Sequence, residues 1–452
     1  MATNQAKTRE LILAGNLYKV LSVVSFPILV TNVIQAFYEL TDMFYVGKLG
    51  AVPLAALSLT GPINFLIMVF AMGMAMGSIS LMSKAIGEGT FSKFSKYAGQ
   101  LLFLNFISSL FVMVFILLSI DSILDFMSVK GDLRELTKSY FYVTAYAIPV
   151  MFLSISIVYI LNSQGETIIS MIIILIANVI NFILDPILMF AFDLGIAGAA
   201  WATFFSKLVT VFSYLFLTYG LNRGFKISLG DMMPDIAVMR NIFNLGFPAA
   251  FGQIMTSLSF LVFNYLVIQI SPKFLAAYGL TNSIIAFLLL PGMSIGTGII
   301  TIVGQNLGAK NFDRIGDALK KGFFLSLIVL FTINVIIISF RESIAAFFTD
   351  DFEVLSYAND YLLLASIGTV GYGLQQVFFG GLIGSGFTKL VMVIVCVRLW
   401  VIRLPVVLIF QYFGIMEDSL GYAFIISNYV AFGILLYFTL TKYWLKTQRS
   451  ST

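Results

Sequence analysis

The stretch LAALSLTGPINFLIMVFAMGMAMGSISLMSKAIGEGTF, residues 54–91, decides the fold because the chain contains a second version of it. Shifted by 221 positions, it aligns without a gap on LAAYGLTNSIIAFLLLPGMSIGTGIITIVGQNLGAKNF, residues 275–312. The identical pairs along the chain include Pro27 and Pro248, Thr60 and Thr281, Gly77 and Gly298, Tyr140 and Tyr361, and Thr167 and Thr388. Agreement at one fixed offset over such a distance predicts two homologous halves.

The composition places both halves in a membrane. The 452 residues are 60% hydrophobic and 11% charged, whereas soluble proteins carry roughly 45–50% apolar and about 25% charged residues. A water-soluble protein is thereby excluded. Apolar runs long enough to cross a bilayer, which needs about 20 residues, predict twelve spans. They are 17–46, 53–83, 97–120, 135–162, 168–192, 196–220, 239–270, 275–305, 316–340, 356–384, 388–412 and 419–445.

An even number of spans in each half makes the repeats parallel, because the second half then enters the membrane from the same side as the first. We therefore predict an all-α polytopic membrane protein with twelve transmembrane helices in two six-helix lobes. The N-lobe would cover 1–220, a cytoplasmic linker 221–238 and the C-lobe 239–452.

The net charge of +4 is spread over short loops and forms no basic block, so we expect no nucleic-acid partner. If both termini are cytoplasmic, seventeen Lys and Arg residues outside the spans lie inside the cell and six lie outside. This asymmetry predicts cytoplasmic termini.

Several kinds of chemistry are excluded by what the sequence lacks. It contains no histidine and one cysteine, Cys396, which rules out a disulfide within the chain and leaves any proton coupling to carboxylates. No P-loop, metal motif or nucleophile elbow occurs, and the glycine pairs Gly73/Gly77 and Gly380/Gly384 have the spacing of close helix packing in lipid. We expect neither an enzyme nor an ATP-driven pump, and no cofactor; a secondary transporter remains.

Charged residues inside the predicted spans are the leading functional candidates. An unpaired charge near the bilayer centre costs roughly 2.5–3.5 kcal/mol on insertion scales, so it should face protein or an aqueous cavity. The candidates well inside the spans are the acids Glu39, Asp42 and Asp185 and the bases Lys207, Arg398 and Arg403.

Glu39 and Asp42 lie three residues apart and would share one face of a helix. Such a pair can take up a proton or bind a cation; alternatively, Glu39 is simply hydrated near the outer end of span 1. Asp185 follows Asn181 by one turn, and Pro186 would free a backbone carbonyl. Carboxylate, amide and carbonyl oxygens form a site for a hard cation, although Asp185 could instead cap a helix break.

The three bases are harder to interpret. Arg398 and Arg403 are five residues apart and on an α-helix would point in different directions, which argues against one bidentate anion site. They would pair with carbonyls or carboxylates, or shape the field of a cavity. Lys207 lies one turn after Thr203 and would either snorkel or lie near Asp185.

Taken in order along the chain, these motifs resemble the multidrug and toxic compound extrusion (MATE) transporters of the multidrug/oligosaccharidyl-lipid/polysaccharide exporter superfamily. The motifs are SFPILV (25–30), YELTD (38–42), LMSKAIGEG (81–89), NVINFILDP (178–186), GIAGAAWAT (195–203), VGQNLGAKN (303–311) and RLWVIRLP (398–405). Span 7 has no carboxylate, and span 10 has none after Asp360. The chain therefore resembles the DinF-like branch most.

The resemblance implies a V-shaped pair of lobes that alternates between outward- and inward-open forms while exchanging Na⁺ or H⁺ for an organic, often cationic, compound. The implied ion-coupling residues, also the ligands of a possible Na⁺, are Asp42, Asn181, Asp185 and Thr203, with Glu39 as an additional candidate. Pro27 would be the hinge of span 1. The substrate-cavity candidates are Tyr38, Gln253, Arg398 and Arg403.

The expected partners are small organic substrates and membrane lipids, with the chain monomeric in the plasma membrane of a prokaryotic cell. The alternative function is a lipid or lipid-linked oligosaccharide flippase of the same superfamily. Such a protein would use several cavity cations for anionic headgroups, which is the role that Arg398, Arg403 and Lys207 would then have.

Overall fold

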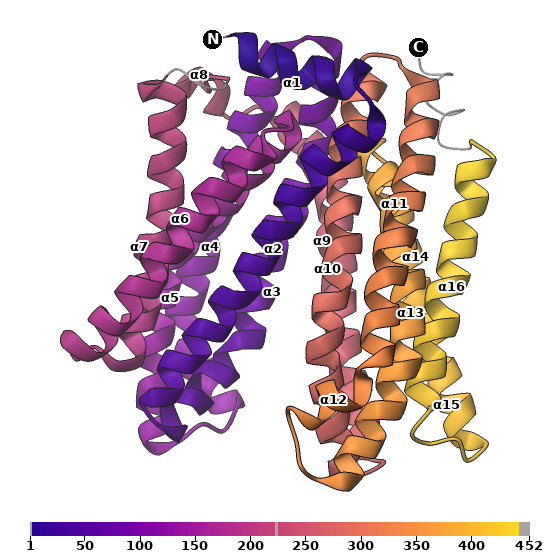
Figure 1. The fold of residues 1–452 in the computed structure, drawn as a ribbon. Helices are drawn as coiled ribbons and strands as arrows, with labels where there is room; N and C mark the ends of the chain where they lie inside the picture. The colour runs from indigo at the N-terminus through magenta and orange to yellow at the C-terminus, as the bar shows by residue number, and fades with distance from the viewer. Residues whose placement is uncertain (1, 222–224, 443–452) are drawn as a thin grey trace. The chain divides into compact units, whose positions relative to one another are not determined.

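The computed structural model describes residues 2–221 and 225–442. All regular secondary structure within these ranges is helical (Figure 1). Twelve helices in the described ranges are long and apolar enough to cross a membrane, which confirms the predicted number. Part of the predicted linker, 222–224, and the basic residues Lys446 and Arg449 lie outside the described residues.

The membrane-spanning helices of the first half are α2 to α7. They are α2 (Leu17–Lys48), α3 (Ala51–Glu88), α4 (Phe91–Phe126), α5 (Gly131–Gln164), α6 (Thr167–Pro186) with the π-helical turn η1 (Ile187–Ala191), and α7 (Gly195–Leu215) with the π-helical turn η2 (Phe216–Gly220). The short helices α1 (Ala2–Ala14) and α8 (Leu229–Met232) flank them.

The second half repeats this order. Its spans are α9 (Ile236–Ile268), α10 (Pro272–Gly308), α11 (Phe312–Ser339), α13 (Phe352–Gly384), the composite of α14 (Thr388–Cys396), π-helical η3 (Val397–Arg403) and α15 (Leu404–Tyr412), and α16 (Ser419–Leu440). The short helix α12 (Arg341–Ala346) follows α11. The first residues of α10, α11, α13 and α14 each lie 221 positions after those of α3, α4, α5 and α6. The three-dimensional helix order thus follows the sequence repeat.

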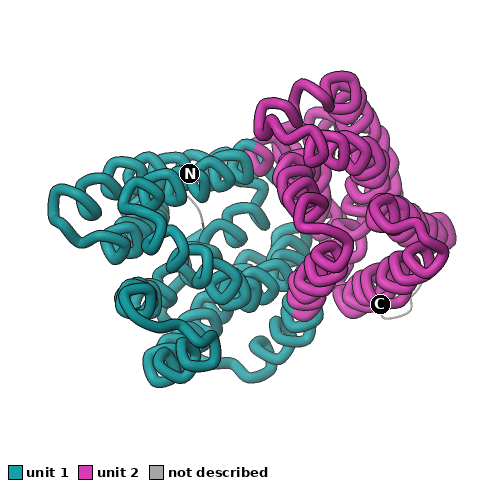
Figure 2. Tube along the Cα trace, turned by 90° about the horizontal axis from the view of Figure 1, so that it is seen from below, with its two compact units in different colours: residues 1–10, 30–250 teal, residues 11–29, 251–452 magenta. Residues whose placement is uncertain are grey.

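By its packing the chain divides into two compact units (Figure 2). Unit 1 contains residues 1–10 and 30–250, and unit 2 contains residues 11–29 and 251–452. The divisions fall inside α1, α2 and α9 and not in the predicted linker, so each of these helices contributes to both units.

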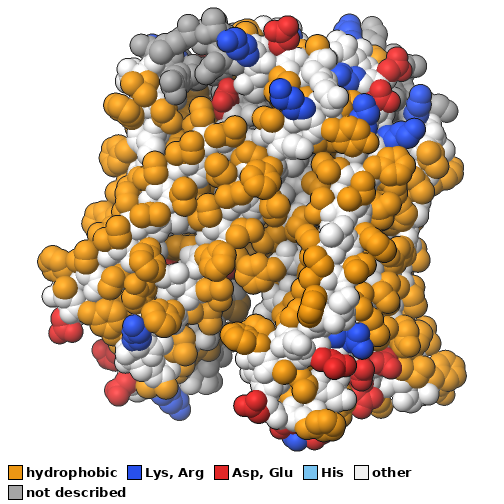
Figure 3. Space-filling view, in the orientation of Figure 1, with side chains coloured by type: hydrophobic (Ala, Val, Ile, Leu, Met, Phe, Trp, Pro, Cys, Tyr) orange, Lys and Arg blue, Asp and Glu red, His pale blue; other side chains and the backbone are white. Residues whose placement is uncertain are grey.

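The outer surface matches a bilayer environment. On the face seen in Figure 3, Lys, Arg, Asp and Glu side chains gather toward the ends of the helices, and hydrophobic side chains cover the length between. Exposed apolar residues such as Phe111, Leu118 and Phe212 lie within spans. Their exposure is costly in water and neutral in lipid.

Close helix contacts in each unit depend on glycine. In unit 1, a Cβ atom on Gly77 of α3 would lie 2.5 Å from the backbone nitrogen of Gly246. In unit 2, a Cβ on Gly384 of α13 would lie 2.7 Å from the carbonyl oxygen of Ile300. Neither space admits a side chain, which confirms that these glycine spacings serve helix packing.

Candidate functional site

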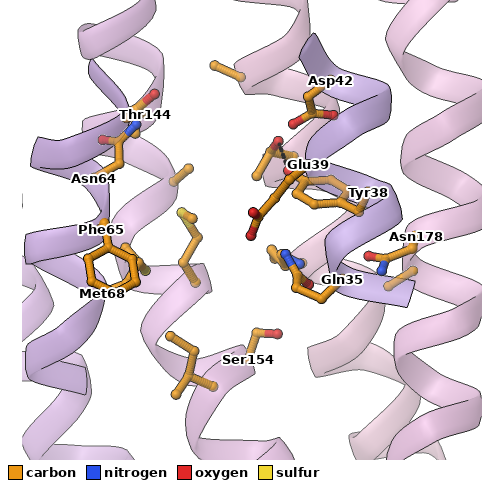
Figure 4. A pocket seen from close by; sticks show the side chains of 18 of the residues that line it. Gln35, Tyr38, Glu39, Asp42, Asn64, Phe65, Met68, Thr144, Ser154 and Asn178 are labelled. Carbon is orange, nitrogen blue, oxygen red and sulfur yellow. Dashed lines mark hydrogen bonds between the residues drawn. The ribbon is translucent and has the colours of Figure 1, made fainter. Parts of the chain in front are cut away.

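A cavity of about 670 Å³ lies within unit 1. Its walls come from α2, α3, α5, α6 and α7 (Figure 4). The volume falls in the range of about 300–1,000 Å³ that is usual for small-molecule sites. This cavity can therefore hold an organic ligand.

The lining is mainly apolar and adaptable, with few charges. Methionine and aromatic side chains form much of the surface: Met43, Met68, Met72, Met151, Tyr38, Phe65, Tyr140 and Tyr159. Among the described lining residues the charged ones are Glu39, Asp42 and Lys207. Methionine repacks readily around differently shaped ligands, and two acids against one base leave an acidic surplus.

Helix α2 presents its polar side chains to this cavity. Gln35, Tyr38, Glu39 and Asp42 follow one another at helical spacing and all line the cavity. In Figure 4 the Glu39 carboxyl group points into the open space, toward the wall that carries Asn64, Phe65 and Met68. Asp42 is half-buried, so the two predicted acids line one cavity in different surroundings.

Behind this wall lies a buried polar cluster. Asp185 and Asn181 of α6 are 0% and 1% exposed. With the Asn181 amide oriented to satisfy both of its ends, Nδ2 donates to Asp185 Oδ2 at 3.1 Å and the amide oxygen accepts from the Thr203 backbone nitrogen at 3.3 Å. The hydroxyls of Tyr38 and Thr203 lie 2.7 Å apart. The structure therefore brings together the four predicted ion-coupling residues of α2, α6 and α7.

The carboxyl groups of Asp42 and Asp185 lie within hydrogen-bonding reach of each other. Two ionised carboxylates repel at such a distance, so either a proton is shared between them or a cation lies beside them. Both arrangements require one positive charge at this position. The cluster can thus bind H⁺ or a small monovalent cation.

The π-helical turn η1 follows Pro186 directly. Phe192 N donates to Ile187 O at 2.9 Å, a bond between residues five apart. Proline has no backbone N–H and disturbs the α-helical ladder at its own position, and π turns are frequent at functional sites. The irregular backbone therefore lies next to Asp185.

Two residues near the site, Tyr140 and Asn178, were not predicted to act there, and a third, Lys207, was predicted either to snorkel or to lie near Asp185. Tyr140 lies close enough to Asp42 and Asp185 for an electrostatic interaction with both. Lys207 Nζ lies 5.0 Å from the centre of the Tyr38 ring. Asn178 lines the cavity, and neither end of its buried amide has a hydrogen-bond partner among the described residues. The sequence signal that could have identified Asn178 was its position as the first residue of the motif NVINFILDP.

The remaining predicted residues belong to unit 2. Pro27 lies buried inside α2, three residues before that helix enters unit 1. Gln253 is half-buried in α9. Arg398 and Arg403 lie in η3, and both guanidinium groups donate to Oδ1 of Asn428. The expectation that these two arginines point in different directions does not hold, because it assumed α-helical geometry.

Comparison with known proteins identifies the family. The MatE family model matches residues 27–187 and again residues 248–409, which together make up most of the chain. The chain belongs to the MATE family. The two matches begin 221 residues apart, so the family model itself repeats at the offset found in the sequence. MATE proteins are membrane transporters, and this one is a transporter and not an enzyme.

Curated MATE relatives cover nearly the same length. YoeA of Bacillus subtilis, named a probable multidrug resistance protein, is 26% identical over 92% of this chain and 93% of its own. The multidrug export protein MepA of Staphylococcus saprophyticus is 26% identical over 80% of each chain.

Solved structures share the fold. An outward-facing multidrug resistance MATE transporter has a TM-score of 0.90 at 21% identity, covering 95% of this chain and 97% of its own. A transporter of the same superfamily from Pyrococcus furiosus, described as having a binding pocket of reversed polarity, also has a TM-score of 0.90 at 21% identity, with 96% and 98% covered.

Proposed function

We propose that this MATE protein is a secondary active multidrug efflux transporter of the plasma membrane, exporting organic cations in exchange for H⁺ or Na⁺. The observation that carries the proposal is the cavity in unit 1, whose wall on α2 joins a buried carboxylate pair to a space of about 670 Å³. The named multidrug activity of YoeA and MepA supports it.

Selection of cations follows from the lining. Glu39 and Asp42 outnumber Lys207, so the described lining residues carry a formal charge of −2 + 1 = −1 when all three are ionised. Aromatic faces of Tyr38 and Phe65 add cation–π attraction for an organic ammonium group. The unpartnered amide of Asn178 offers one hydrogen bond without dictating the shape of the ligand.

Coupling would act through competition for negative charge. When an ion from outside occupies the Asp42–Asp185 pair, the cavity loses part of its attraction for a cationic substrate, which is released. An ion can shift the transporter between two states only by the difference in its affinity for them. The buried pair provides that difference if one state exposes it and the other seals it. In this mechanism Pro27 lets α2 bend between the two states.

The flippase alternative has no comparable support. It requires several cations facing one large cavity, whereas Lys207 is the one cation among the described residues that line the unit 1 cavity. Arg398 and Arg403 are bonded to side chains of α16 in unit 2.

Replacement of Asp42 by Asn tests the proposal in cells that depend on the transporter for drug resistance. We expect resistance to fall to the level of cells without the protein, because the neutral asparagine amide has no negative charge to attract H⁺ or Na⁺. The matched control is Asp360→Asn, which removes an exposed carboxylate of α13 in unit 2 and should leave resistance intact. Full resistance with Asp42→Asn, at equal amounts of folded protein, would contradict the proposal.

A further inference from the structure

Unit 2 contains two intramembrane cations that the proposed transport cycle does not use. Arg398, 4% exposed, and the half-buried Arg403 both belong to η3. Arg398 Nη1 and Arg403 Nη2 lie 3.5 and 3.0 Å from the same oxygen, Oδ1 of Asn428. Arg403 Nε also donates to Ser427 Oγ at 2.8 Å. Two positive groups thus converge on one neutral amide.

The convergence is a consequence of the π-helical turn. Residues five apart on an α-helix diverge, but a π-helix bonds residue i to residue i+5 and so aligns them. Arg398 and Arg403 are the pair that η3 aligns. Since a π turn is a rare and less favourable backbone, its presence where a buried and a half-buried arginine meet points to a use for their meeting.

The positive charge of this cluster has no neutralising partner among the described residues. The groups that act electrostatically on the two guanidinium groups are the hydroxyls of Tyr278, Tyr361 and Tyr372 and each other; no carboxylate is among them. Neither arginine takes part in an ion pair of the described chain, and Arg398 Nε has no hydrogen-bond partner there. A buried cation without a counter-charge is strongly disfavoured.

A small cavity lies beside Arg403. Its volume is about 20 Å³, and its polar lining consists of the Arg403 guanidinium, which only donates, and of the Tyr278 and Tyr361 hydroxyls and the Asn282 amide, which can donate or accept. The other lining residues are apolar: Phe260, Phe263, Val407, Leu420 and Phe424. About 10–15 Å³ holds one water molecule, so the space admits one water molecule or one monatomic ion and excludes a phosphate or an organic anion.

The internal repeat places this cavity at the counterpart of the coupling cluster of unit 1. With the 221-residue shift, Asp42 corresponds to Phe263 and Tyr140 to Tyr361. Arg403 has the neutral Phe182 as its counterpart. At the same place in the fold, unit 1 therefore has acids and unit 2 has a cation, so the two places favour ions of opposite sign.

We propose that unit 2 binds one small monovalent anion, chloride, in this cavity. The Arg403 guanidinium holds the ion, Tyr278, Tyr361 and Asn282 supply further donors, and Arg398 contributes positive charge from η3. The bound chloride offsets one of the two positive charges of the cluster and so stabilises unit 2. The proposal stands on unit 2 alone and does not depend on what unit 1 transports.

The first test is the thermal unfolding of the purified full-length protein in detergent at constant ionic strength. Sodium chloride and sodium bromide should raise the unfolding midpoint relative to sodium gluconate and sodium sulfate, because a ligand that binds only the folded state stabilises it. Equal midpoints in all four salts would overturn the proposal.

Crystals grown in bromide give a direct view of the site. An anomalous bromide peak should lie against Arg403, and halide density elsewhere only would also overturn the proposal.

The second test uses variants. Arg403→Gln should raise the chloride concentration that gives half of the midpoint shift by about ten- to hundredfold, as expected for losing a charged hydrogen bond. Lys389→Gln removes an exposed cation of the same composite span and should leave the dependence unchanged. If Arg403→Gln does not fold, Tyr278→Phe, which removes one donor and keeps the ring, should give a smaller loss. Unchanged chloride dependence in the folded variants would place the anion elsewhere and contradict the proposal.

Discussion

At the scale of single residues, the candidate site of unit 1 depends on acids that lie inside membrane-spanning helices. Glu39, Asp42 and Asp185 could be selected from sequence because hydrocarbon tolerates an acid only where protein or water surrounds it. Asn178 and Tyr140 could not be selected in this way, since neutral polar residues are common in spans. Whether such a residue meets the cluster depends on the rotation of its helix, which the sequence alone does not determine.

Asp185 should be essential for coupling because its carboxyl group is 0% exposed and interacts with that of Asp42. We predict that Asp185→Asn abolishes ion-driven transport but leaves binding of an organic cation to the cavity, since Asp185 does not line it. Equilibrium binding of a fluorescent cation and transport in vesicles measure the two properties separately. Transport at the wild-type rate would show that the pair is not the coupling site.

Glu39 should tune substrate choice. Its carboxyl group points into the open cavity (Figure 4), where a solvent-accessible ion pair contributes little. We predict that Glu39→Gln weakens binding of a monovalent organic cation by about two- to fivefold and leaves binding of a neutral analogue of the same shape unchanged. Titration with both compounds checks this. Equal loss for both would mean that Glu39 acts through the shape of the cavity.

At the scale of helices, bilayer thickness made the spans predictable. All twelve predicted spans correspond to helices, and several helices, such as α3 and α4, extend beyond them at both ends. The π turns were not predicted, because composition does not distinguish i→i+5 from i→i+4 bonding. That limit had one clear consequence: Arg398 and Arg403 were expected to diverge and instead meet at Asn428.

Helix packing around glycine can be tested by adding a side chain. Gly77→Leu should destabilise the protein by about 1–3 kcal/mol or prevent folding, because a Cβ there already meets backbone. Gly433→Leu is the matched control, since nothing lies within 4 Å of a Cβ at that glycine of α16. The thermal unfolding midpoint in detergent compares the two variants. Similar midpoints would contradict the packing argument.

Pro27 should matter for motion more than for binding. It interrupts the hydrogen-bond ladder of α2 close to the point where that helix enters unit 1. We predict that Pro27→Ala slows transport while binding to the unit 1 cavity persists, because alanine restores a stiffer helix. Pro62→Ala in α3, an exposed proline that does not line the cavity, is the control. Transport by Pro27→Ala at the wild-type rate would contradict a hinge role for Pro27.

At the scale of the whole molecule, one helical plan is used twice with different polar contents. The repeat was visible in sequence because its glycines, prolines and threonines maintain the scaffold. The difference between the halves was visible in the sequence only where charged residues have apolar counterparts: Asp42 and Asp185 correspond to Phe263 and Val406. The structure adds that Phe263 borders the small cavity beside Arg403 in unit 2, where we propose that an anion binds. On that proposal the halves have diverged in the sign of the charge they accommodate.

The central claim, ion-coupled export through the carboxylate pair of unit 1, is tested most directly in proteoliposomes. Movement of a fluorescent organic cation should be driven by an imposed Na⁺ gradient or an imposed proton gradient, each applied alone, and should be absent for Asp42→Asn. Movement that neither gradient stimulates, or that Asp42→Asn supports fully, would contradict the account.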